Sequence, residues 1–240
     1  MYNQFPLFDR QKDFLANGIF RAITQQLPEI IAENNLPTSV GSGLFRWNFV
    51  NKNLSETFDT NFESSIQTRG AWKLLLLIDQ LSGLSFSIMS ENNFRKIQRH
   101  PSERVHYLEA LVSNNKNRAP EQEQISLFKS HISRDQKMLC ELRNQLLSMF
   151  PYVISEHILI LFDYTFNEVT SVRAVLLNPK MEIAYSEDWT AHMKNTFISS
   201  GSIMTDYLDD DSMLAKLKPE YDKNIVVSIN AEDDKKDAVN

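Results

Sequence analysis

The chain has 240 residues, a mass of 27.8 kDa and a formal net charge of −6. Apolar residues make up 42% of it and charged residues 23%, which fits a globular protein and excludes a wholly disordered or fibrous chain. The longest uninterrupted apolar stretches, such as Leu74–Ile78, have five residues. Because a helix needs roughly 20 apolar residues to cross a bilayer, no membrane span is expected.

The sequence contains a single cysteine, Cys140. One cysteine excludes an internal disulfide framework and a zinc site built from cysteines. The first residues have no basic region followed by a long apolar core, so we expect no secretory signal. A cytoplasmic protein is the expectation.

The first predicted element is a long amphipathic helix from Arg10 to Asn35. Its apolar residues recur at spacings of three and four, which places Phe14, Leu15, Ile19, Ile23, Leu27, Ile30 and Ile31 on one face. We expect this stripe to pack on a sheet or on a second copy of itself. Pro28 predicts a kink or a new helix that begins there. A loop follows at 37–43, where two of the six glycines lie.

A β-hairpin is predicted over 72–89. Its first strand, Trp72–Asp79, is almost wholly apolar, as in strands buried on both faces. Its second strand, Leu84–Ile88, alternates apolar and polar residues, which predicts one solvated face. Ser90 is the expected N-cap of a helix that ends at His100-Pro101.

More helices and strands are predicted after the hairpin. Three helices are predicted. The first covers 102–112, the second follows a capping box formed by Ser133 and Gln136 and continues through Met149, and the third covers 187–197. The strands cover 157–164, 169–177 and 181–185, with the last two forming a hairpin over 169–185, and a short strand is expected at 225–229.

The predicted fold class is therefore α+β, with antiparallel β units flanked by helices. We expect a single domain over 1–230, or two contiguous halves that meet near 115–123. Residues 231–240 include six charged side chains and little to bury, so a disordered acidic tail is predicted there.

Charge is unevenly distributed along the chain. Ten acidic and five basic residues follow Ser200, whereas residues 1–199 are almost neutral. Within that neutral part, 95–118 forms a basic patch. A basic patch beside an acidic tail predicts an anionic partner or a tail that folds over the patch, although solvated surface is the simpler explanation. The residues expected to contact nucleic-acid phosphates are Arg46, Arg95, Lys96, Arg99 and Arg104.

No catalytic residue, metal ligand or cofactor is predicted. The sequence has no glycine-rich phosphate-binding loop and no Gly-x-Ser-x-Gly elbow. Cys140 is expected to be a buried thiol within a helix, and His157 a strand-end or core histidine with a satisfied hydrogen bond. A metal-dependent nuclease would require carboxylates such as Asp79 or Asp163 at strand ends, but no acid-x-Lys pair lies on a predicted strand.

Several segments resemble a family of bacterial proteins described only as a domain of unknown function. They are Arg46-Trp47-Asn48, Trp72–Asp79, Ser82–Met89 and 106–111, and the resemblance spans about residues 41–189. It implies a bacterial, cytoplasmic protein linked to mobile elements, and it transfers no active-site residues.

The function expected first is that of a non-catalytic binding or regulatory protein. Its partner would be another protein or a second copy of the chain, bound through the acidic C-terminal region or the N-terminal helix. Nucleic-acid binding through the basic patch is the alternative, and a metal-dependent nuclease is the weakest of the three.

Overall fold

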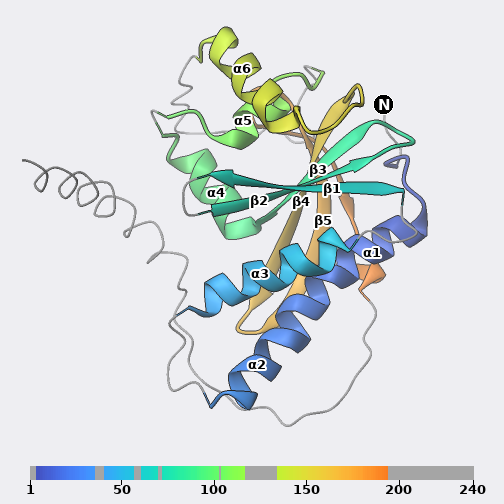
Figure 1. The fold of residues 1–240 in the computed structure, drawn as a ribbon, viewed down its shortest axis with the longest axis vertical. Helices are drawn as coiled ribbons and strands as arrows, with labels where there is room; N and C mark the ends of the chain where they lie inside the picture. The colour runs from blue at the N-terminus through green and yellow to red at the C-terminus, as the bar shows by residue number, and fades with distance from the viewer. Residues whose placement is uncertain are drawn as a thin grey trace, which may run out of the picture. The chain divides into compact units, whose positions relative to one another are not determined.

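The computed structural model describes residues 4–35, 41–56, 61–69, 72–102, 104–116 and 134–193, all within the unit Met1–Met204 (Figure 1). Its strands are β1 (Phe62–Arg69), β2 (Trp72–Asp79), β3 (Leu84–Ser90), β4 (Glu156–Thr165), β5 (Glu168–Leu177) and β6 (Ile183–Asp188). Its helices are α1 (Asp9–Phe20), the π-helical η1 (Arg21–Gln26), α2 (Leu27–Glu33), α3 (Ser42–Ser55), α4 (Glu91–Arg99), α5 (Tyr107–Val112), α6 (Gln136–Leu147) and the 3₁₀ turn η2 (Thr190–His192). The α+β class is confirmed.

The six strands form one mixed sheet in sequence order. Neighbouring strands are antiparallel except β3 and β4, which pair in parallel from Leu84↔Glu156 to Ser90↔Phe162. A parallel pair needs a long crossover connection, and here that connection carries α4, α5 and α6. The two predicted hairpins therefore belong to a single sheet.

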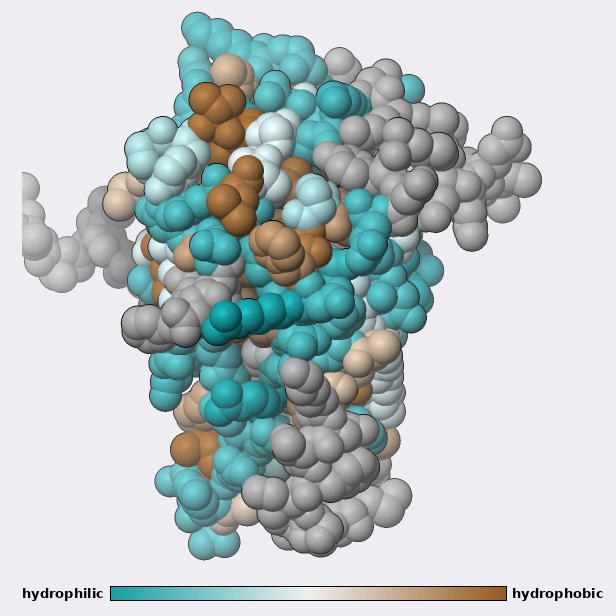
Figure 2. All heavy atoms as spheres, turned by 90° about the vertical axis from the view of Figure 1, so that its right-hand side faces the viewer, coloured by the Kyte–Doolittle hydropathy of each residue, from teal (hydrophilic) through white to brown (hydrophobic). Residues whose placement is uncertain are grey.

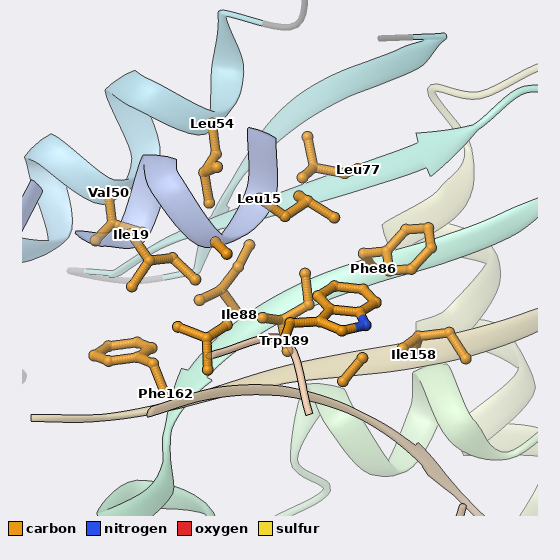
Figure 3. Close-up of a cluster of buried hydrophobic side chains, with 14 of the residues drawn as sticks. Leu15, Ile19, Val50, Leu54, Leu77, Phe86, Ile88, Ile158, Phe162 and Trp189 are labelled. Atoms are coloured by element: carbon orange, nitrogen blue, oxygen red, sulfur yellow. The ribbon is translucent and has the colours of Figure 1, made fainter. Parts of the chain in front are cut away.

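The long N-terminal helix packs on one face of this sheet together with α3 (Figure 3). Ile19, Ile23 and Leu27 of the predicted stripe are fully buried, and Phe14 is half-buried. Each such side chain contributes about 1.5–3 kcal/mol when it leaves water. The stripe thus packs on the sheet of its own chain, and Pro28 lies in the first turn of α2 as expected.

The opposite face of the sheet carries α4, α5 and α6. Phe94 of α4 and Leu108 of α5 are buried against Leu159 and Leu161 of β4. Leu146 of α6 is buried against β2. Helices thus cover both faces of the sheet.

The polar side of β3 is buried, and the prediction of a solvated face is wrong. Ser85 and Ser87 are fully buried because α4–α6 lie over this side of the sheet. Their hydroxyl groups lie 2.9 Å from the two ring nitrogens of His157. The polar residues of the alternating pattern, Ser85 and Ser87, therefore bind a buried histidine and do not face solvent.

The predicted helix over 187–197 does not form where the chain is described. Strand β6 continues to Asp188, and the Trp189 amide donates to the Val172 carbonyl at 2.8 Å. Trp189 is fully buried, so the chain follows the sheet instead of leaving it. The predicted strand at 225–229, the domain end at residue 230 and the tail 231–240 lie outside the described residues.

Two helix starts also differ from prediction. Helix α6 is capped by Asp135, whose carboxylate accepts from the Lys137 amide, and Ser133 lies outside the described residues. Helix α5 starts at Tyr107 because the His106 Nδ1 atom accepts from the Leu108 amide at 3.2 Å.

Strand β1 (Phe62–Arg69) was not predicted from the sequence.

Large apolar side chains are exposed near the β2–β3 turn. Leu81 lies in this turn, and Tyr152 and Val153 lie in the segment before β4. The turn and the segment are joined by the Ser155 amide, which donates to the Gly83 carbonyl at 2.9 Å. Figure 2 shows hydrophobic residues grouped within a largely hydrophilic surface. None of the described helices is both long and apolar enough to cross a membrane.

Candidate functional site

Helix α4 carries two of the predicted basic residues to an open cleft. The helix begins because the Ser90 hydroxyl accepts from the Asn93 amide at 3.3 Å. Phe94 anchors its inner face on the sheet, which leaves Arg95 and Arg99 exposed. Residues four apart lie above one another on a helix, with a rise of about 6 Å. The two guanidinium groups therefore follow one edge of the cleft.

The cleft lies between α4 and the strands β5 and β6. Its volume is about 400 Å³, and its lining residues are Glu91, Phe94, Arg95, Gln98, Arg99, Arg173 and Ile183. The Gln98 side chain donates to the Met181 carbonyl at 2.9 Å, which ties α4 to the β5–β6 turn. Three arginines and one carboxylate thus face the same space.

The carboxylate of Glu91 fixes two of the arginines. Its oxygens accept from the Arg173 Nη2 atom at 2.7 and 3.0 Å and from the Arg173 Nε atom at 3.3 Å. The Arg95 Nε atom donates to the same group at 3.3 Å. Paired arginines lose less freedom when a ligand binds, so the cleft is partly pre-organised.

Arg99 remains available for a ligand. Its side chain is exposed and forms no ion pair with any residue that the structure describes. Guanidinium groups bind phosphates and carboxylates through paired hydrogen bonds. With one carboxylate against three arginines, the cleft has the chemistry to hold an anion.

The other predicted phosphate-binding residues lie outside the cleft. Lys96 is exposed on α4 and Arg104 is exposed in the loop before α5. Arg46 belongs to α3 on the opposite side of the sheet, where it is only 9% exposed. Its Nη1 atom donates to the Tyr164 hydroxyl at 2.6 Å, and its guanidinium carbon lies 4.1 Å from the centre of that ring.

Arg173 lines the cleft but was not among the predicted phosphate-binding residues. It is the one basic side chain within β5, a largely apolar strand. No spacing or motif connects it with α4, because the two meet only once β3, β4 and β5 stand side by side. Its partner Glu91 supplies the only local signal, an acidic residue in the first turn of α4.

The residues considered for catalysis do not converge. Asp79 is 1% exposed and binds the Gln11 side chain at 2.8 Å and the Ser82 amide at 2.9 Å. Asp163 is exposed on β4. The described residues contain no group of three acidic, histidine or cysteine side chains that could hold a metal ion.

His157 is a core histidine with satisfied hydrogen bonds, as predicted. It is 1% exposed and lies between Ser85 and Ser87. Burial, with a smaller contribution from the charge of Arg143, lowers the pKa of His157 to about 3. The ring is therefore neutral at pH 7. Cys140, by contrast, is exposed on α6, on a different side of the helix from the buried Leu139 and Leu146, so the prediction of a buried thiol is wrong.

Comparison with known proteins identifies a family but no activity. The model of a family of unknown function, DUF5986, matches residues 6–238. No curated protein and no solved structure matches the chain. The resemblance to a domain of unknown function is thereby confirmed and extends over nearly the whole chain.

Proposed function

The chain belongs to DUF5986, a family of unknown function, and we propose that it is a non-catalytic binding protein whose arginine-lined cleft holds the phosphate groups of a nucleic acid. The observation that carries this proposal is the meeting of Arg95, Arg99 and Arg173 around one cleft in which Glu91 is the only carboxylate among the described lining residues. We also propose a bacterial, cytoplasmic setting, which the family resemblance implies.

Phosphate groups suit the cleft better than a small apolar ligand. The cleft is open, and the free Arg99 lies one helical turn from the paired Arg95, so consecutive charges along a polyanion would meet consecutive guanidinium groups. Lys96 and His100 are exposed on and just after the same helix and would add to the attraction. Such contacts provide affinity without base specificity, because phosphates carry no sequence information.

The non-catalytic part of the proposal rests on the burial of Asp79 and His157. Asp79 and His157 are each 1% exposed, and both already have hydrogen-bond partners inside the protein. A substrate would have to displace these partners to reach either side chain. The described residues therefore favour recognition over bond-making.

The proposal is tested by the salt dependence of nucleic-acid binding. Fluorescence anisotropy with labelled 20-mers of single-stranded DNA, duplex DNA and RNA should show binding at 50 mM KCl that weakens steeply by 200 mM. Arg99→Ala should weaken binding to every sequence and reduce the slope of log K against log salt by about one. Because Arg99 has no described ion pair, this variant should fold normally.

Lys137→Ala is the matched control. Lys137 is 83% exposed on α6, and its substitution removes one positive charge far along the chain from the cleft. It should change the slope by much less than Arg99→Ala does. Absence of binding at low salt would refute the proposal, and equal binding of polyglutamate would indicate an acidic protein as the partner.

A further inference from the structure

The β4–β5 hairpin extends beyond the rest of the sheet. Pairing of β3 with β4 ends at Phe162, and pairing of β5 with β6 starts at Arg173. Residues 163–171, here called the arm, pair only with each other among the described strands. In the view of Figure 1 the arm turns near α2.

Two contacts hold the arm in a fixed position. The Tyr164 hydroxyl accepts from the Arg46 Nη1 atom of α3 at 2.6 Å. On the other strand, the Val169 amide donates to the Thr24 hydroxyl of η1 at 3.1 Å, and the Val169 side chain is only 4% exposed. The tip of the arm is therefore presented rigidly.

Phe166 at the tip has an unfavourable backbone and an unfavourable environment. Its φ is 55°, a region that favours glycine and asparagine and that bulky side chains rarely adopt. Its side chain is 56% exposed and makes no ring contact with a described residue. A polar residue would suit folding better on both counts, and strain of this kind is concentrated at functional sites.

The charge of the arm restricts the kind of partner. Its only charged residues are Asp163 and Glu168, which are both acidic and both exposed. Two carboxylates disfavour contact with a nucleic acid or an anionic membrane, and they would repel the same arm of a second copy. An apolar pocket with basic groups at its rim complements all three side chains.

We propose that the arm is a docking element that inserts Phe166 into an apolar pocket of a partner protein with Lys or Arg at its rim. Asp163 and Glu168 pair with that rim, and the contacts through Tyr164 and Val169 hold the tip in place. An exposed aromatic side chain that fills a pocket is a frequent binding anchor. This interaction is independent of the arginine cleft.

The proposal is tested by site-specific crosslinking in intact cells that express the full chain. A photoreactive benzoylphenylalanine in place of the exposed Thr165 should form one main adduct with a protein, identified by mass spectrometry. Adding Phe166→Asn should reduce this adduct at least tenfold without lowering the melting temperature, since asparagine tolerates the backbone conformation. Adding Asp163→Lys with Glu168→Lys should reduce it similarly.

The same photoreactive group at Leu81, which is 67% exposed on the β2–β3 turn, is the matched control. An adduct that is shared with the Leu81 control, has twice the mass of the chain or is removed by nuclease would overturn the proposal. So would the absence of any adduct at Thr165, or an adduct that Phe166→Asn leaves unchanged.

Discussion

At the scale of single residues, His157 shows how the fold decides the chemistry of a side chain. A histidine free in water has a pKa near 6.5, so it is partly charged at neutral pH. Here the ring lies 2.9 Å from two serine hydroxyls and the residue is 1% exposed, and burial lowers the pKa of the ring to about 3. The side chain stabilises the interior as a neutral group.

This low pKa predicts acid sensitivity of the fold. Between pH 6.5 and the folded pKa of about 3, the unfolded chain binds a proton at His157 that the folded chain does not bind. The free energy of unfolding should therefore fall by about 1.4 kcal/mol for each pH unit below 6.5 on account of this residue. Urea denaturation at pH 7, 6 and 5 measures the fall.

His157→Gln should flatten that pH dependence because glutamine does not titrate. Its stability at pH 7 should be lower than that of the unmodified protein, so the informative quantity is the slope against pH and not the absolute value. His100→Gln, which makes the same substitution at an exposed position, is the control. An unchanged slope in His157→Gln would contradict the prediction.

Residues also show where the sequence stops being informative. The burial of His157 could be predicted from the apolar run that follows it, because that run has the pattern of a buried strand. The pairing of Arg173 with Glu91 could not, because 82 residues separate them and nothing local selects one partner over another. The predicted Arg95 and Arg99 share the cleft because they share a helix, whereas Arg46 lies in the other layer.

At the scale of elements, α1 and α3 are in close contact at a single glycine. A Cβ atom added at Gly18 would lie 2.3 Å from the Leu54 Cδ2 atom and 3.2 Å from its Cγ atom. The Asn53 side chain also donates to the Gly18 carbonyl at 3.0 Å. An alanine here would force the Leu54 side chain of the second helix to move.

Gly18→Ala should therefore destabilise the protein, although alanine is the better helix former. Alanine gains about 1 kcal/mol of helix propensity, but overpacking a filled core costs about 1–3 kcal/mol. Leu54 is fully buried in the core cluster, so its displaced side chain would press on the neighbouring core residues. Thermal or urea unfolding of the single variant should show a net loss of stability.

The loss should depend on Leu54. In a Leu54→Ala background the clash is removed, so Gly18→Ala should be neutral or stabilising by up to about 1 kcal/mol. Equal effects of Gly18→Ala in both backgrounds would show that helix contact is not the cause.

Elements differ in how much of them the sequence predicts. The long N-terminal helix and β2 have strong periodic or continuous apolar patterns because their buried faces are wide. Strand β1 has only Phe62 and Ile66 as large apolar residues, since it lies at the edge of the sheet and has one neighbouring strand. Such a strand has a weak hydropathy pattern in the sequence. Its position is set by its hydrogen-bonded pairing with β2.

At the scale of the whole molecule, the first and last described parts of the chain are joined by a partly buried ion pair. Lys12 of α1 and Glu187 of β6 are 2.6 Å apart, and the lysine side chain is only 1% exposed. Glu187 also accepts from the Phe5 amide at 2.7 Å and from the Trp189 indole at 3.0 Å. Residues 175 positions apart are therefore held by one carboxylate.

Opposing effects act on the pKa of the Glu187 carboxylate. Burial alone would raise the pKa of Glu187, but the hydrogen bonds from Lys12, Phe5 and Trp189, with the charge of Lys12, lower it overall. The group is therefore charged at neutral pH and stabilises the fold there. This contribution is lost as the pH falls below about 4.5, the ordinary value for glutamate.

Lys12→Met should destabilise the whole fold, because it leaves the partly buried carboxylate without its cation. Breaking one partner of a fully buried ion pair costs about 3–5 kcal/mol, and a lower cost is expected here because the Glu187 side chain is 16% exposed. Replacing both partners with apolar groups is often neutral. The double change Lys12→Met with Glu187→Met should therefore recover much of the stability lost by Lys12→Met alone. Urea denaturation of the single and double variants compares them, with Lys137→Met as an exposed control. If the double variant is no more stable than Lys12→Met, the packing of the lysine stem, and not its charge, holds α1 against β6.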